Sequence, residues 1–357
     1  MKGRKLNKEI RQMRFKNIIT AVDSHTEGEP ARIVIGGAVP FVPGKTMFEK
    51  WVYAKKNLDK FRTMLMYEPR GHSAMSGSIV MQPTRPEADI GVLFIEVSGW
   101  LPMCGHGAIA TCTVLIETGI IEAKEPVTKF TLDTPAGLVK AEVEVKDGKA
   151  KRVTIKNVPS FLYKSDVTIN VPEVGKVKLD IAYGGNFYAI LPAKDVGLEV
   201  VPEQNNELIE IGRKIRAAVN EQVKVVHPEN PKIDICSHVR FLGPTKLAKL
   251  GTRNAVIYGP GQIDRSPCGT GTSAEVAVNY AKGKLKLNEE FICESIIGSH
   301  FVAKAVEETK VADYKAIVPA ITGRAWVMGI QQFVLDPDDP FPTGFYIGPK
   351  DPKYGGI

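Results

Sequence analysis

Apolar and polar residues alternate along much of the chain, which is the spacing typical of β-strands with one buried face. Residues 17–35 predict two short strands around a polar turn. Residues 129–158 predict period-two runs joined by a hairpin turn at residues 146–149 (Lys-Asp-Gly-Lys). Residues 253–259 predict a further strand, and residues 291–306 predict returning β structure.

Three segments instead carry apolar residues at the three- and four-residue spacing of a helix. Residues 105–120 and 268–283 predict helices that end at Gly119 and Gly283. Residues 205–220 predict the most clearly amphipathic helix, whose apolar face indicates packing rather than function.

Two of these helices begin at a cysteine with the same surroundings. The motif MCGHGAIA around Cys104 and the motif PCGTGTSA around Cys268 share the spacing Cys-Gly-x-Gly-x-x-Ala. A turn-like glycine follows each cysteine at a similar distance, Gly137 after 33 residues and Gly298 after 30 residues. This agreement predicts an internal duplication of the chain.

Composition restricts the class of protein. The 357 residues are 43% hydrophobic and 24% charged, enough for a sizeable core and two domains. The net charge of +7 is concentrated in residues 1–16, which carry seven basic residues and one acidic residue. Because the remainder is nearly neutral and no signal peptide or membrane span is evident, we expect a cytoplasmic protein with no nucleic-acid or membrane partner. Five cysteines without a secretory signal indicate reduced thiols.

The paired cysteines suggest acid/base chemistry. A cysteine at a helix N-terminus meets free backbone N–H groups and the positive end of the helix dipole, which can lower its pKa from about 8.5 to roughly 3.5–7.5. The glycines behind it let an anion such as a carboxylate approach the backbone. Two such sites facing each other would place a sulfur on each side of an α-carbon. One thiolate would remove the α-proton and the opposing thiol would return a proton to the other face.

The chain resembles the proline racemase family in four ordered motifs. They are DSHTEGEPARIV near the start, EPRGHSAMSG at residues 68–77, MCGHGAIA and DRSPCGTGTSA, and the resemblance extends from about residue 17 to about residue 347. It implies two similar α/β domains of the diaminopimelate epimerase type, each a curled β-sheet around a central helix. It also implies an active site in the interdomain cleft and no cofactor or metal.

The sequence predicts the following division of the chain. A basic N-terminal arm at residues 1–16 precedes a first α/β domain at residues 17–170 and a second α/β domain at residues 171–330. The C-terminal segment, about residues 331–347, is expected to pack on the first domain. We place the boundary near residues 165–180, because residues 163–176 are polar and predict irregular structure. The sequence does not determine the oligomeric state and is compatible with a homodimer.

The resemblance also implies the site residues. Cys104 and Cys268 would be the catalytic acid/base pair of an amino-acid racemase or epimerase acting on a small imino acid. The substrate carboxylate would bind backbone groups at Gly105, His106, Gly269 and Thr270, and the side chains of His106 and Asp264 would hold the ring nitrogen. A carboxylate such as Asp264 can pair with a secondary ammonium.

Two further positions bear on the substrate. Relatives commonly carry aromatic residues at the positions of Ser76 and Tyr258, and this chain keeps only the second. A serine hydroxyl would leave room for a hydroxylated ring and offer it a hydrogen bond. We therefore favour 4-hydroxyproline 2-epimerase over proline racemase as the predicted activity.

Other interpretations of the same residues stay open. A trans-3-hydroxyproline dehydratase is disfavoured because that branch usually has threonine at the position of Cys268, and a non-catalytic amino-acid-binding homologue would use the same carboxylate site. Cys104, His106, Asp264 and Cys268 are conceivable zinc ligands, but their spacing is not that of compact structural sites. The Gly-x-Gly-x-x-Ala pattern is a weak dinucleotide signal, since no strand directly precedes Gly269.

Overall fold

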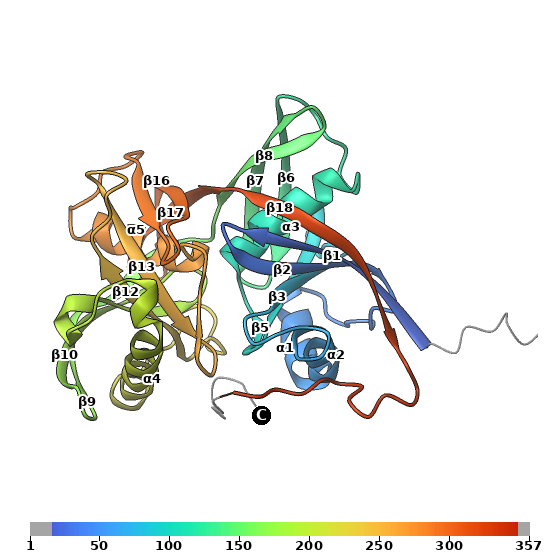
Figure 1. Ribbon diagram of the computed structural model, residues 1–357. Helices are drawn as coiled ribbons and strands as arrows, with labels where there is room; N and C mark the ends of the chain where they lie inside the picture. The colour runs from blue at the N-terminus through green and yellow to red at the C-terminus, as the bar shows by residue number, and fades with distance from the viewer. Residues whose placement is uncertain (1–15, 349–357) are drawn as a thin grey trace, which may run out of the picture.

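Two buried helices organise the computed structural model, which describes residues 16–348. They are α3 (Gly105–Glu117) and α5 (Gly269–Ala281), and strands surround each of them (Figure 1). Every residue of α3 from Gly105 to Ile116 is buried, because these residues, apart from His106, are apolar or small on all sides of the helix. A helix of that composition requires neighbours around its whole circumference.

The first part of the chain supplies eight strands and three helices. They are β1 (Lys16–Thr26), β2 (Glu29–Gly37), α1 (Met47–Asn57), α2 (Asp59–Met66), β3 (Ser76–Met81), β4 (Ile90–Glu96), β5 (Gly99–Leu101), α3, β6 (Val127–Thr134), β7 (Gly137–Lys146) and β8 (Lys149–Lys156). The second part begins with β9 (Ser160–Val171), β10 (Gly175–Tyr183), β11 (Phe187–Pro192), the short 3₁₀ helices η2 (Ala193–Val196) and η3 (Pro202–Gln204), and α4 (Asn205–Gln222). It continues with β12 (Cys236–Gly243), β13 (Gly251–Tyr258), β14 (Gln262–Ile263), α5, β15 (Phe291–Glu294), β16 (His300–Val311), β17 (Tyr314–Gly323) and β18 (Ala325–Leu335).

The two parts repeat one order of strand pairing. In the first, β2 pairs parallel with β3, β3 antiparallel with β4, and β4 parallel with β6, which leads through β7 to β8. In the second, β11 pairs parallel with β12, β12 antiparallel with β13, and β13 parallel with β15, which leads through β16 to β17. In both, the cysteine-linked helix follows the short strand, β5 or β14, and precedes the second parallel partner. The pairing agrees with the duplication predicted from the cysteine motifs.

Local sequence signals account for several elements. The two strands predicted in residues 17–35 form β1 and β2, and the predicted helices form α3, α4 and α5. The predicted hairpin turn between β7 and β8 is confirmed, with Asp147 at φ 54° and Gly148 at φ 69°. Two successive residues of positive φ are what a two-residue hairpin turn requires.

The prediction of irregular structure at residues 163–176 is wrong. This segment lies in an antiparallel hairpin of β9 and β10, whose turn at residues 172–174 contains Glu173 at φ 64°. Its apolar residues Val167, Ile169 and Val171 alternate with polar ones, and Ile169 and Val171 are buried. The polar residues between them face solvent, so their number obscured a strand pattern.

The C-terminal segment runs back along the first part of the chain (Figure 1). β18 pairs antiparallel with β1, and an isolated bridge joins Phe345 to Glu68. Arg70 forms an ion pair with Asp339. The basic arm predicted at residues 1–16 lies outside the described residues except for Lys16. Within residues 16–348, no helix has the length and apolar character needed to cross a membrane.

Candidate active site

The two helices that begin at the paired cysteines meet at their N-termini. A Cβ atom at Gly105 would lie 2.5 Å from the Cα of Gly269, and one at Gly269 would lie 2.6 Å from the Cα of Gly105. Side chains do not tolerate contacts this short, so the close approach of the backbones requires glycine at both positions. The two glycines thus allow the N-termini of α3 and α5 to come into contact. This is in addition to the anion-binding role expected from the sequence.

Replacing Gly105 by alanine is expected to lower the free energy of unfolding by about 1–3 kcal/mol, because the new methyl group would overlap backbone atoms. Gly36→Ala is the matched control, since a Cβ at Gly36 would meet nothing within 4 Å. Thermal and denaturant unfolding of the two variants provide the measurement. Equal stability of Gly105→Ala and Gly36→Ala would contradict the described contact.

A small cavity lies beside this helix contact and contains both sulfur atoms. Its volume is about 20 Å³, close to the space that one water molecule needs. A larger cavity of about 160 Å³ adjoins it and shares part of its wall. The small cavity is lined by Glu96, Leu101, Met103, Cys104, Gly105, His106, Asn186, Tyr188, His238, Tyr258, Asp264, Cys268, Gly269 and Thr270. All predicted site residues except Ser76 are therefore in its wall.

Each cysteine occupies the N-cap position of its helix, but their backbones differ. Cys104 is extended, with φ −141° and ψ 112°, whereas Cys268 has φ 63° and ψ 101°. Both residues are only 6% exposed. Positive φ is uncommon for a residue with a side chain and persists only where surrounding contacts hold it.

Ser76 lies behind His106 rather than in the cavity wall. Its hydroxyl donates to the Pro30 carbonyl at 2.9 Å and lies 2.7 Å from His106 Nε2. Because the hydroxyl proton is used on Pro30, the imidazole donates from Nε2 and its Nδ1 is an acceptor. Nδ1 lies 3.5 Å from Cys104 Sγ. Burial lowers the pKa of His106, which favours this neutral ring.

Asp264 and Tyr258 are also fixed by hydrogen bonds. Asp264 Oδ1 accepts from the backbone N–H and the hydroxyl of Ser266, both at 2.8 Å. Both of these bonds involve Oδ1, which leaves Oδ2 available to a ligand in the cavity. Tyr258 donates its hydroxyl to buried Glu29 at 2.9 Å.

The surroundings of the two sulfur atoms disfavour thiolates, contrary to the expectation from helix position alone. Burial raises the pKa of Cys104 well above its ordinary value, and burial also raises that of Cys268. The negative charges of Glu96 and Asp264 add to the effect on Cys104, and that of Asp264 adds to the effect on Cys268. Burial and these charges therefore outweigh the backbone hydrogen bonds from Gly107 and Gly271, which act to lower the two pKa values.

Four polar residues of the cavity wall were not found from the sequence. Asn186 donates to the Met103 carbonyl at 2.9 Å, and the Tyr188 hydroxyl lies 3.3 Å from Cys268 Sγ. The His238 ring contacts that of Tyr188 at a tilt of 30°, with 4.7 Å between ring centroids, and burial lowers the pKa of His238 to about 3. Glu96 ends β4. The available signal was a polar side chain within an otherwise apolar strand, as in the segments around Tyr188 and His238.

The pKa of Glu96 is raised to about 7, mainly by burial, although Ser98 donates a hydrogen bond to it. The folded state thus holds this proton more tightly than the unfolded state, for which 4.5 is the ordinary value. Stability should therefore fall as pH rises from about 4.5 to about 7.

Over this pH range, the free energy of unfolding of Glu96→Gln is expected to decrease by about 2–3 kcal/mol less than that of wild type, because glutamine does not ionise. Denaturant unfolding of both proteins at several pH values between 4 and 8 provides the measurement. Parallel pH profiles for the two proteins would contradict the assigned ionisation.

Within the described residues, no group of three or more His, Cys, Asp or Glu side chains is arranged to hold a metal ion.

Comparison with known proteins gives consistent matches. The sequence family described as proline racemase matches residues 21–346. The chain is 55% identical to a 4-hydroxyproline 2-epimerase of Streptosporangium roseum and 47% identical to a proline racemase of Clostridioides difficile. Each match covers 94% of this chain and 100% of the relative. A crystal structure of an Agrobacterium vitis hydroxyproline epimerase with bound trans-4-hydroxy-L-proline superposes with a TM-score of 0.89 at 36% identity, covering 94% of this chain and 97% of that one.

Proposed function

The chain belongs to the proline racemase family, and from this membership we propose that it is an isomerase that inverts the α-carbon of proline-type imino acids, with 4-hydroxyproline as the favoured substrate. Proline racemase is the alternative. The observation that carries the proposal is the convergence of Cys104 and Cys268, from two different helix N-termini, on one cavity. The 55% sequence identity to the 4-hydroxyproline 2-epimerase of Streptosporangium roseum supports the choice of substrate.

The proposed reaction uses one thiolate and one thiol. The thiolate takes the α-proton, so that the C–H bond breaks and an S–H bond forms, and the opposing thiol gives its proton to the other face of the same carbon. The two cysteines exchange protonation states in each turnover, so their titrations are coupled. Backbone N–H groups at Gly105, His106, Gly269 and Thr270 would hold the substrate carboxylate.

Substrate binding would also help to form the thiolate. Asp264 would pair with the ring ammonium, and the His106 Nδ1 lone pair would accept a hydrogen bond from it. Pairing neutralises the Asp264 charge, which is one of the causes of the raised pKa of both thiols. The imino acid thereby offsets part of the rise in pKa that Asp264 causes at the two thiols.

The finer architecture is part of this proposal. We propose two similar domains of the diaminopimelate epimerase type, with the boundary between β8 and β9 rather than at residue 170, because β9 pairs with β10. Residues 331–347 would pack on the first domain, and the active site would lie in the cleft between the two. The repeated strand pairing around α3 and α5 supports the two domains, and pairing of β18 with β1 supports the place of the C-terminal segment. Because the cavity of about 20 Å³ is small for an imino acid, the walls must separate to admit it.

His238 is the group proposed to recognise a ring hydroxyl. It lines both the small cavity and the larger one beside it. Its Nδ1 lies 2.7 Å from the Ser237 hydroxyl, which leaves Nε2 for a ligand. Ser76, first expected to contact the hydroxyl, is instead proposed to hold the His106 ring through its contact with Nε2.

The function is tested by incubating the purified protein with trans-4-hydroxy-L-proline or L-proline in deuterated water. Chiral chromatography reports inversion, and NMR reports α-deuteration. We expect inversion of both, with kcat/KM at least about tenfold higher for 4-hydroxyproline. Absence of both inversion and exchange would overturn the proposal. A cyclic imine trapped by borohydride from 3-hydroxyproline would indicate a dehydratase, and calorimetric binding without turnover would indicate a binding protein.

Two variants separate the roles of His238 and Ser76. His238→Ala is expected to lower kcat/KM for 4-hydroxyproline about tenfold more than for proline, because only the hydroxylated ring loses a hydrogen bond. Ser76→Ala is expected to lower kcat/KM for both substrates alike. If Ser76→Ala lowered kcat/KM for 4-hydroxyproline selectively, the contact with the ring hydroxyl of the substrate would be assigned to Ser76 instead.

A further inference from the structure

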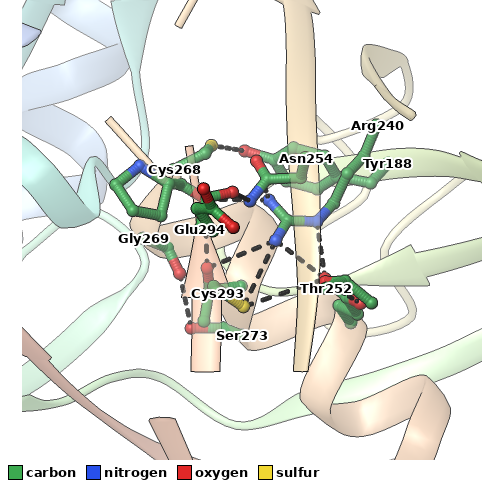
Figure 2. Close-up of polar contacts among 12 residues, drawn as sticks. Tyr188, Arg240, Thr252, Asn254, Cys268, Gly269, Ser273, Cys293 and Glu294 are labelled. Carbon is green, nitrogen blue, oxygen red and sulfur yellow. Dashed lines mark hydrogen bonds and ion pairs between the residues drawn. The ribbon is translucent and has the colours of Figure 1, made fainter. Parts of the chain in front are cut away.

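A buried ion pair stands directly behind Cys268. Arg240 of β12 is 0% exposed and pairs with Glu275 of α5, which is 1% exposed, at 2.7 Å. Figure 2 shows the guanidinium at the centre of the polar contacts that lie behind the cysteine. Its further contacts are with Asn254 Oδ1 and the Pro267 carbonyl, both at 2.9 Å, Cys293 Sγ at 3.4 Å and Thr272 Oγ1 at 3.5 Å.

One of these contacts bears on the backbone of Cys268. Arg240 donates to the carbonyl of Pro267, the residue directly before the cysteine. The Ser266 hydroxyl accepts from the Cys268 N–H at 3.1 Å, and Asp264 in turn holds Ser266. These bonds fix the segment in which Cys268 has φ 63°. A conformation that is unfavourable for a residue with a side chain is thus held from both sides.

The guanidinium is also close to the sulfur. A Cβ atom on Gly271 would lie 2.9 Å from Arg240 Nη1 and 3.1 Å from Cys268 Sγ. The cationic nitrogen and the sulfur are therefore within about 6 Å of each other, and only a glycine separates them. At this distance inside a protein, a positive charge stabilises a thiolate appreciably.

Cys104 has different surroundings, although the two motifs are alike in sequence. Its sulfur faces the Nδ1 atom of the neutral His106 ring and shares the cavity wall with the Glu96 carboxyl. A neutral ring and a carboxyl group give no comparable stabilisation to a thiolate. The two thiols of the pair are thus electrostatically unequal.

We propose that Arg240 is a positioning residue for Cys268, which holds the backbone of the cysteine through Pro267 and favours the thiolate at Cys268 over the thiolate at Cys104. The mechanistic consequence rests on the proposed function, whereas the inequality of the two thiols does not. Glu275 keeps the buried guanidinium in place, and Asn254 fixes its orientation.

Some of the groups around Cys268 raise its pKa and others lower it. Asp264, from the segment before α5, raises the pKa of Cys268, and Arg240 lowers it. Tyr188 of β11 places its hydroxyl 3.3 Å from the sulfur, and Cys104 and Glu96 face it across the cavity. Cys293 of β15 and Glu275 of α5 lie on the far side of Arg240. Arg240 is the cation nearest to Cys268 among these groups.

The test compares wild type with Arg240→Lys, Arg240→Met and the double variant Arg240→Met/Glu275→Gln, which avoids an unpaired buried carboxylate. Arg253→Met is the matched control, because Arg253 lies on the neighbouring strand β13 and donates to the Ile296 carbonyl instead. Iodoacetamide is applied between pH 6 and 10.5, and peptide mass spectrometry gives separate rates for Cys104 and Cys268. The rate against pH of 4-hydroxyproline inversion is recorded in parallel.

Loss of Arg240 is expected to slow alkylation of Cys268 about tenfold relative to Cys104 and to shift its pH midpoint upward, because the thiolate loses a cation. Inversion should show its acidic limb at higher pH, with kcat reduced more than KM is changed, and Arg240→Lys should restore part of both. Arg253→Met should leave the alkylation ratio unchanged.

An alkylation ratio and pH midpoint unchanged in Arg240→Met/Glu275→Gln would overturn the proposal, as would a wild-type protein in which Cys104 ionises at lower pH than Cys268. If the Arg240 variants do not fold, the wild-type midpoints decide alone. Absence of inversion in every protein, together with the expected alkylation ratios, would reject the proposed function and leave the inequality of the thiols standing.

Discussion

Replacing either Cys104 or Cys268 by serine is expected to reduce kcat for inversion by about 10³-fold or more. A serine hydroxyl is a far weaker acid than a thiol, and each positioned proton transfer contributes about 10²- to 10⁴-fold. Inversion needs both transfers, one on each face of the α-carbon, so neither cysteine can replace the other. Chiral chromatography of the product over time provides the measurement.

Cys236→Ser is the control for this experiment, because Cys236 is buried but does not line the cavity. It should retain nearly full activity. Unfolding temperatures of all three variants should stay close to that of wild type, since the change at each position is small. Wild-type inversion rates in either Cys104→Ser or Cys268→Ser would show that the reaction does not use the proposed pair.

Much of the site was predictable because its signals are local. The Cys-Gly-x-Gly spacing places each cysteine at the start of a helix, and α3 and α5 begin directly after Cys104 and Cys268. The turn at Asp147 and Gly148 depends on the same kind of short-range requirement, positive φ at two neighbouring positions. Such features are properties of a few consecutive residues and need no knowledge of the tertiary structure.

The surroundings of these residues were not predictable in the same way. Glu96, Tyr188 and His238 come from three different strands. Tyr188 and His238 are partners in the pairing of β11 with β12, and Glu96 of β4 joins them only in the folded protein. The inequality of the thiols depends on Arg240, which is far from both cysteines in the sequence. The hairpin of β9 and β10 was missed because its solvent-exposed face is strongly polar. Burial also reversed the pKa change expected from helix position, since desolvation depends on the whole fold.

The second large effect is expected for Asp264→Asn, which should reduce kcat/KM about 10²- to 10³-fold. Asparagine keeps an oxygen for the Ser266 hydrogen bonds but loses the charge that would pair with the ring ammonium. The same charge adds to the effect of burial in raising the pKa of Cys104 and Cys268. Its removal should therefore lower both pKa values and make both thiols more reactive toward iodoacetamide at a given pH.

This opposite change of activity and thiol reactivity distinguishes a substrate-binding charge from a structural one. A variant whose segment between β14 and α5 is merely disordered would lose activity without a lowered pH midpoint of alkylation, and its unfolding temperature would fall. Ser266→Ala is the matched comparison, because it disturbs the same segment while leaving the carboxylate. It should cost less activity than Asp264→Asn and should not shift the alkylation midpoints downward. Full activity in Asp264→Asn, or thiols less reactive than in wild type, would remove Asp264 from the proposed site.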